Sequence, residues 1–170
     1  MKFNTKLLSL IAFVALISCT SKKQEGVLVS DESIWSIART VSSFSYLHNR
    51  TDTLVADPAT NGSHGNFVRI RFNQKAISAM NDSLSGLSKT FFPNGSLILK
   101  EIYDQSGGSL LEYAVMYKSP EAANSGSGWI WVEFNPNGIV EYSGIRKGDQ
   151  CISCHARGNN ADLVQTFLYH

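Results

Sequence analysis

The stretch Cys151-Ile152-Ser153-Cys154-His155 constrains this chain more than any other part of its sequence. It follows the pattern C-x-x-C-H, in which two thiols can bond to the two vinyl groups on one porphyrin edge and the adjacent imidazole can reach the iron. The sequence therefore predicts one covalently attached haem c, held by Cys151 and Cys154, with His155 as the proximal iron ligand. The rest of the chain then has to form a pocket for this group.

Two cysteines at this spacing also occur in three other settings. A bare C-x-x-C also occurs in redox dithiols and in half of a zinc site, and an exported chain could join the two thiols in a disulfide. None of these explains His155, and the sequence contains no second C-x-x-C to complete a zinc site. The third cysteine, Cys19, lies far upstream, so haem attachment leaves no unpaired thiol in the predicted domain.

The N-terminus has the features of an export signal. Lys2 and Lys6 precede an apolar run from Leu7 to Ile17, which is too short to span a bilayer as a mature helix. Leu16-Ile17-Ser18-Cys19 resembles the lipobox of bacterial lipoproteins, in which the cysteine is lipidated. We expect residues 1–18 to be removed and the protein to be lipid-anchored at Cys19 on the periplasmic side of a bacterial membrane. The alternative is an ordinary secretory signal with an incidental cysteine.

Removal of the signal leaves 152 of the 170 residues, a length typical of one domain. Residues 19–29 are small, polar and charged at first and predict a tether, followed by a single domain over residues 30–170. Loss of the two signal lysines takes the formal net charge from +1 to −1. The mature chain thus lacks the basic excess that nucleic-acid binding requires.

The first half of this domain shows one helical and one strand pattern. Apolar residues recur at helical spacing from Asp31 to about Leu47, with Ser30 as a cap and acidic residues in the first turn. His48 to Asn66 is rich in Pro, Gly, Asn and Asp and predicts a long loop. Phe67 to Phe72 alternates apolar residues with arginines, as a half-buried strand does.

The second half predicts a β-meander. Asn73 can cap a short helix whose apolar face includes Ile77, Met80 and Leu84. Four strand-like runs follow, separated by turn sequences, at 96–103, 109–117, 129–134 and 139–142. The predicted fold class is α+β, mainly an antiparallel sheet with one N-terminal helix, a short second helix and the haem loop near the C-terminus.

Two familiar haem folds do not fit this layout. Small electron-transfer cytochromes c carry the motif near the N-terminus and a methionine ligand far downstream, whereas no Met follows His155 here. The four-helix cytochromes c′ carry the motif near the C-terminus. However, the strand patterns between Ser96 and Tyr142 cannot form two long helices.

The ordered set of motifs resembles the cytochrome P-460 family, which includes the β-sheet cytochromes c′. The resemblance covers roughly Ser30 to Phe167 and rests on Gly65 to Ile70, Phe92 to Glu101, Gly128 to Trp131, Cys151 to Ala156 and Asn160 to Val164. It implies a largely antiparallel sheet that is often dimeric, so a homodimer is one expected assembly. It also implies one haem c with His155 proximal and an open or weakly occupied distal face.

The chemistry of the family depends on the distal side. Members with a lysine joined to the porphyrin resemble hydroxylamine oxidases, and members with an apolar pocket bind nitric oxide or similar gases. Lys100 is the most motif-like candidate, while Lys75, Lys89 and Lys118 stay open. A solvated charge on an edge strand is the competing interpretation of Lys100. Glu133 is the candidate distal proton acceptor, with a surface carboxylate as the competing interpretation. Glu101 should face away from Lys100.

The sixth position of the iron is expected to be exchangeable. Met80 and Met116 lie on patterns typical of buried packing faces. His48 and His64 lie in or beside the long loop, where a second axial ligand could originate, but lone loop histidines are usually exposed to solvent. We therefore expect a cytochrome that acts on small nitrogen species, hydroxylamine or nitric oxide, and passes electrons to a periplasmic electron-transfer protein. The alternative is a non-enzymatic protein that binds diatomic gases or transfers electrons. Aromatic residues are expected either to wall the porphyrin or to pack in the core, namely Phe91, Phe92, Trp129 and Trp131.

Overall fold

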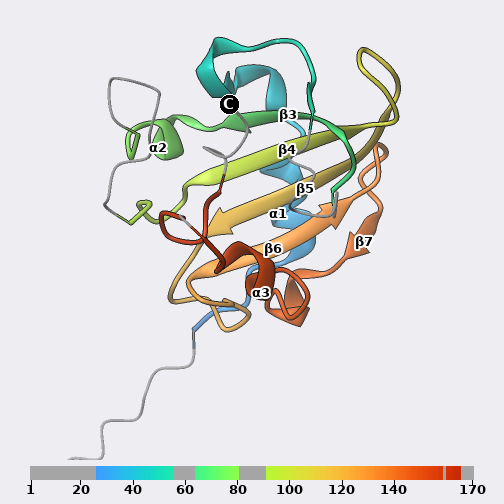
Figure 1. Cartoon of the computed structure of the whole chain (residues 1–170). Helices are drawn as coiled ribbons and strands as arrows, with labels where there is room; N and C mark the ends of the chain where they lie inside the picture. Colours follow the sequence, from blue (N-terminus) through green and yellow to red (C-terminus); the bar gives the residue numbers. More distant parts are fainter. Residues whose placement is uncertain (1–25, 56–63, 81–90, 159, 166–170) are drawn as a thin grey trace, which may run out of the picture.

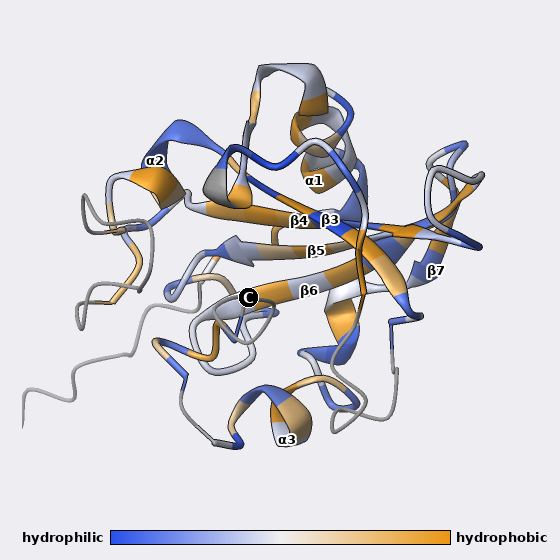
Figure 2. Ribbon diagram, turned by 45° about the horizontal axis from the view of Figure 1, so that its top comes forward, coloured by the Kyte–Doolittle hydropathy of each residue, from blue (hydrophilic) through white to orange (hydrophobic). Residues whose placement is uncertain are grey.

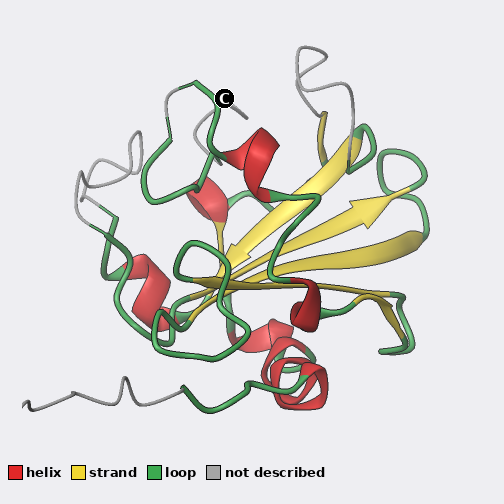
Figure 3. Ribbon diagram, turned by 90° about the horizontal axis from the view of Figure 1, so that it is seen from below, coloured by secondary structure: helices red, strands yellow, loops and turns green. Residues whose placement is uncertain are grey.

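The computed structural model describes residues 26–55, 64–80, 91–158 and 160–165. Its core is one antiparallel sheet in the order β1-β3-β4-β5-β6-β7, with β2 also paired to β3 (Figure 1). The strands are β1 Ser45–Tyr46, β2 Leu54–Val55, β3 Phe67–Phe72, β4 Leu97–Tyr103, β5 Leu110–Lys118, β6 Trp129–Phe134 and β7 Val140–Tyr142. The helices are α1 Asp31–Ala38, α2 Gln74–Ile77, α3 Ile152–His155 and the 3-10 turns η1 Val41–Ser43, η2 Leu47–Asn49 and η4 Gly144–Arg146. The predicted fold class, mainly antiparallel sheet with few helices, is confirmed (Figure 3).

The sheet carries an apolar core on each face, because side chains alternate between the faces of a strand. We call the α1 side the back and the α3 side the front, and Figure 2 shows the two helices on opposite sides of the sheet. The back core consists of Ile34, Ala38, Phe44, Leu97, Leu99, Val115, Ile130, Val132 and Phe134. The front core consists of Leu47, Leu54, Val68, Ile70, Phe72, Ala76, Ala79, Phe92, Ile98, Ile102, Met116, Trp129, Trp131, Tyr142 and Val164.

The N-terminal helix is shorter than its sequence pattern predicts. Ser30 caps it through the Ser33 amide, as expected, but α1 ends at Ala38 rather than near Leu47. Beyond that point the Thr40 and Ser43 hydroxyls donate to backbone carbonyls of Ile37 and Thr40 at 2.6 and 2.8 Å. Such local bonds compete with a continued helix, so the chain turns through η1 into β1.

The residues just before α1 and at its start are bonded to distant parts of the chain. The Asn124 side chain accepts from the Val29 amide at 3.0 Å and donates to the Val29 carbonyl at 2.8 Å. The Asp31 carboxylate accepts from the Ser143 hydroxyl at 2.6 Å and from the Gly144 amide at 2.9 Å. The helix is thereby joined to η4, which leads into the C-x-x-C-H segment.

The remaining patterns place the strands well and the loop less well. The strand predicted at 67–72 and the four predicted later have counterparts in β3 to β7. Asn73 caps α2 through the Ala76 amide at 3.0 Å, whereas Leu84 lies outside the described residues. The predicted loop from His48 contains η2 and the short strand β2, because Leu54 pairs with Val68 and is buried in the front core.

The predicted signal peptide, Cys19 and most of the tether lie outside the described residues. Among the helices that the structure describes, none combines the length and apolar character that crossing a membrane requires.

Candidate haem-attachment site

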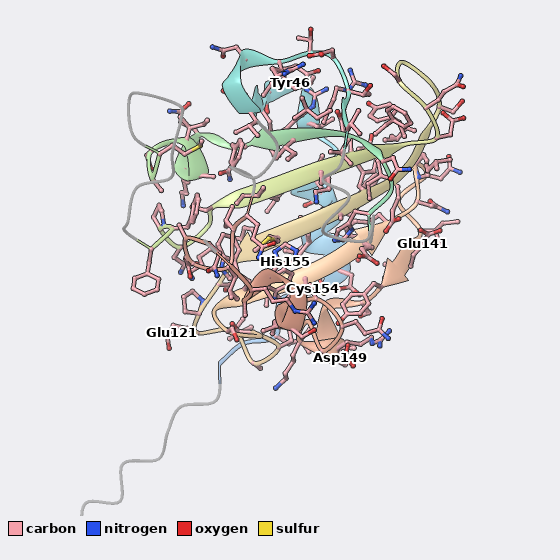
Figure 4. The ribbon with its side chains drawn as sticks, in the orientation of Figure 1. Tyr46, Glu121, Glu141, Asp149, Cys154 and His155 are labelled. Atoms are coloured by element: carbon pink, nitrogen blue, oxygen red, sulfur yellow. The ribbon has the colours of Figure 1, made fainter. Side chains whose placement is uncertain are left out.

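The C-x-x-C-H segment forms the short helix α3 on the front of the sheet, beside β6 (Figure 4). Cys151 is the N-terminal flanking residue, and Cys154 and His155 end the helix. Cys151 is half-buried, Cys154 is exposed, and both thiols are free rather than joined in a disulfide. The structure therefore places two available thiols and one imidazole within a single helical turn.

Gly148 brings the chain close to the sheet just before this helix. Its φ of +70° favours glycine, and a Cβ there would lie 2.4 Å from Cδ1 of Trp131. The Cys151 and Ile152 amides both donate to the Gly148 carbonyl at 3.0 Å, which starts the helical turn. The sequence pattern Gly148 to Cys151 thus fixes where α3 begins.

The segment after α3 holds His155 in one orientation. The Leu163 carbonyl lies 2.8 Å from Nδ1 of His155, so a proton on Nδ1 is donated to it and Nε2 keeps its lone pair. The Gln165 side-chain amide donates to the backbone carbonyls of Cys154 and His155, each at 3.1 Å. These hydrogen bonds occupy the last carbonyl groups of α3, which is too short to be stable alone. They also orient the imidazole toward the sheet.

An ion pair with both side chains almost fully buried fixes that C-terminal segment to the sheet. Lys118, the last residue of β5, donates to both carboxylate oxygens of Asp162 at 2.7 Å. Asp162 also accepts from the Phe92 amide, and its carbonyl accepts from Nε1 of Trp129 at 2.9 Å. Sequence reasoning missed this pair, because nothing in the pattern links residues 44 positions apart.

Three titratable side chains join His155 on the front face. Lys100 pairs with Ala114 in register, and Ala114 pairs with Glu133, so Lys100 and Glu133 share one transverse row of the sheet. Glu112 lies two residues from Ala114 on the same face. Sequence analysis singles out Lys100 and Glu133 but not Glu112, although alternation along β5 puts Glu112 on the same face as Ala114.

Lys100 does not lie on an edge strand, which corrects the competing interpretation. Its strand, β4, lies between β3 and β5, and the side chain is half-buried. Glu101 faces the back as predicted, where its carboxylate lies 3.3 Å from Nε of Arg69 and 3.1 Å from Nε of Arg71. The alternation of β4 therefore separates these two neighbours completely.

The other candidate lysines have different positions. Lys118 forms an ion pair with Asp162, Lys75 is exposed on α2, and Lys89 lies outside the described residues. Of the lysines that the structure describes, Lys100 is the one on the front face whose charge acts on both His64 and His155.

His64 lies close to His155, whereas the side chain of His48 lies outside what the structure describes. The two imidazole centroids are 6.3 Å apart with planes at 78°, and the Trp131 ring is 4.9 Å from that of His155. Nδ1 of His64 is 3.9 Å from Oε1 of Glu133. Front-face residues from β4, β6, α3 and the turn before β3 thus converge at one place.

Burial dominates the electrostatics of this site. It lowers the pKa of His155 to about 4, with a further lowering by the charge of Lys100, and it lowers the pKa of His64 to about 3. It raises the pKa of Glu112 to about 7, assisted by Glu133, and raises the pKa of Glu133 as well. At neutral pH both imidazoles are neutral, which is the form that binds a metal.

The remaining predicted residues have packing roles. Met116 is buried and Met80 is half-buried against the front core, as expected for packing residues. Trp129 and Phe92 are buried with ring centroids 5.6 Å apart, whereas Phe91 is 79% exposed and Nζ of Lys118 lies 5.8 Å from its ring centroid. Within the described residues, no group of three or more His, Cys, Asp and Glu side chains could hold a bare metal ion.

The donor set fits a c-type haem. Two free thiols, a neutral imidazole with Nε2 available and an adjoining apolar wall are the components that such a group needs. Comparison with known proteins agrees: residues 48–166 match the family model described as Cytochrome P460. No curated protein matches the chain.

Proposed function

Because the chain belongs to the cytochrome P460 family, and is thus a haem-binding cytochrome, we propose that it is an exported mono-haem c-type cytochrome acting on small nitrogen species. The expected substrates are hydroxylamine and nitric oxide. The observation that carries the proposal is the placement of Glu133, Glu112 and Lys100 on the sheet face toward which His155 points.

Different side chains would attach the haem, bind its iron and accept protons. Cys151 and Cys154 would attach the haem, and His155 would hold it with its Nδ1 fixed by the Leu163 carbonyl. When bound, the haem supplies one-electron redox chemistry at its iron. Oxidation of hydroxylamine releases protons together with electrons, and a carboxylate positioned at the site can accept those protons.

Glu133 and Glu112 are suited to that task, because burial raises the pKa of both carboxyl groups. The neighbouring Glu133 raises the pKa of Glu112 further, whereas the hydrogen bond with Glu112 partly offsets the rise at Glu133. A carboxylate whose pKa lies near the working pH both accepts and returns protons readily. Lys100 adds a positive charge next to the imidazoles, and it is also our candidate for a second covalent link to the porphyrin. The electrons would leave to a periplasmic electron-transfer protein.

Export and anchoring are part of the same proposal. Haem c is attached outside the cytoplasm, and the apolar run ending at Ile17, followed by Cys19, supports lipidation there. The lipid would hold the protein at the membrane, close to its electron partner, without entering the chemistry.

The test is to express the full chain in a host competent in cytochrome c maturation and to assay hydroxylamine oxidation with an artificial electron acceptor. We expect turnover that falls about 100-fold in Glu133→Gln, within the usual range for loss of a general base. Glu121→Gln is the matched control, since Glu121 is exposed in the loop between β5 and β6. Absence of turnover in the haem-loaded wild type would overturn the enzymatic proposal.

The alternative is a non-enzymatic protein that binds diatomic gases or transfers electrons. The proximity of His64 to His155 favours it, because a second imidazole close to the iron competes with substrate. Mass spectrometry of the haem peptide discriminates between the two. A lysine link in addition to the thioethers supports the enzyme, and thioethers alone support the alternative.

A further inference from the structure

We propose that His64 is a displaceable sixth ligand of the haem iron, so that the resting protein holds its iron between His155 and His64. This inference rests on the proposed haem attachment. It replaces the expectation of an unfilled sixth position, which was based on the sequence placing no histidine over the porphyrin.

The distance between the two rings is the first argument. Two imidazole nitrogens bound to opposite sides of one metal ion are about 4 Å apart, and their ring centroids about 6 Å apart, since each metal–nitrogen bond is about 2 Å. The centroids of His64 and His155 are separated by 6.3 Å. Their planes cross at 78°, so the rings are not stacked on each other.

The positions of the ring nitrogens are the second argument. Histidines that bind a metal direct their other nitrogen to a carbonyl or a carboxylate. His155 directs Nδ1 to the Leu163 carbonyl at 2.8 Å, and Nδ1 of His64 is the nitrogen near the Glu133 carboxylate, at 3.9 Å. Both imidazoles therefore have a polar group on the Nδ1 side, which leaves Nε2 as the ligating atom in each.

The turn before β3 explains why His64 arrives there. Gly65 has a φ of +73°, and a Cβ at this position would lie 3.1 Å from Cγ2 of Ile102 on β4. The turn therefore needs a glycine both for its backbone conformation and for its close approach to the sheet. The pair His64-Gly65 is a structural unit that directs an imidazole to the front face.

The two histidines are held unequally. His155 is on α3, whose last carbonyls are bonded by Gln165 and whose following segment is fixed by the Lys118–Asp162 pair. His64 precedes a strand, and its Nδ1 lies 3.9 Å from Oε1 of Glu133, which is longer than a hydrogen bond. His64 is therefore the ligand that leaves when a small molecule binds, and its departure controls access to the iron.

The experiment uses the full-length holoprotein with its covalent haem, and compares wild type with His64→Ala by absorption and electron paramagnetic resonance. We expect low-spin iron in the wild type and high-spin iron in His64→Ala, with added imidazole restoring the low-spin spectrum of the variant. His48→Ala is the matched control and should keep the wild-type spectrum.

Carbon monoxide binding to the ferrous protein provides a kinetic readout. In the wild type the observed rate should level off at high gas concentration, because His64 has to dissociate first. In His64→Ala the rate should rise linearly and exceed the wild-type rate at least about tenfold, as expected when the open form is a tenth of the population or less.

The outcomes separate this inference from the proposed function. A wild-type protein without covalent haem would overturn the attachment itself. A haem-loaded wild type with high-spin iron and a linear gas dependence would leave the attachment standing and overturn the role of His64, as would low-spin iron that persists in His64→Ala. The wild-type measurements alone decide the matter if the variant fails to fold.

Discussion

Lys118 and Asp162 form an ion pair with Nζ 2.7 Å from both carboxylate oxygens, and their side chains are only 7% and 5% exposed. The pair joins the last residue of β5 to the segment that orients His155. Removing one member leaves the other buried and unpaired, which costs about 3–5 kcal/mol.

We therefore expect Lys118→Met to lower the free energy of unfolding by that amount, as measured by chemical denaturation. The double variant Lys118→Met/Asp162→Leu should recover much of the loss, because both buried charges are then absent. Lys147→Met is the control, as Lys147 is exposed. Equal stability of Lys118→Met and wild type would show that the pair contributes nothing.

The proposed covalent attachment of haem should depend on Cys151 and Cys154 independently. Each thiol forms one thioether, so Cys151→Ala or Cys154→Ala should lose one link, and the double variant should lose all haem on denaturing electrophoresis with haem stain. His155→Ala should keep the thioethers and change the spin state of the iron. A wild-type band without stain, from a maturation-competent host, would contradict the assignment.

The contribution of Glu112 to the free energy of unfolding should decrease as the pH rises from about 4.5 to 7. Its folded pKa is about 7 and its ordinary value is 4.5, so the folded state binds more protons than the unfolded state in this interval. Because the side chain is only half-buried, the effect is about 1–2 kcal/mol after screening. Denaturation of Glu112→Gln across this pH range should show a flatter profile, and an unchanged profile would refute the assignment.

Cys19→Ser should release the protein from the membrane or block processing of residues 1–18. The reason is that no apolar run after Ile17 approaches the ~20 residues that span a bilayer, so the lipid alone would hold the chain. Detergent phase partitioning measures the result. Equal partitioning of the variant and the wild type would refute the lipid anchor.

Sequence patterns predicted the sheet because alternation is a local property. Val68, Ile70 and Phe72 are buried in the front core, as their spacing in 67–72 indicates. The helix from Asp31 was predicted too long because Val41, in η1, and Phe44, the residue after η1, pack against the back core without a continued helix.

The site was predictable only in part, for a physical reason. Cys151, Cys154 and His155 could be selected directly, because haem attachment requires them at a fixed spacing within five residues. Lys100 and Glu133 face the same site only because of the register of three strands. The approach of His64 to His155 and the pairing of Lys118 with Asp162 depend on long-range packing, for which neither segment carries a pattern.

The bonds from Asp31 to Ser143 and Gly144 have a consequence for the order of assembly. They join residues 112 and 113 positions apart, so they close among the last contacts during folding. In the proposed export, N-terminus first, β3 to β6 would leave the translocation pore before η4 and α3. The thiols of α3 would then be open to a haem-attaching enzyme until η4 docks on α1.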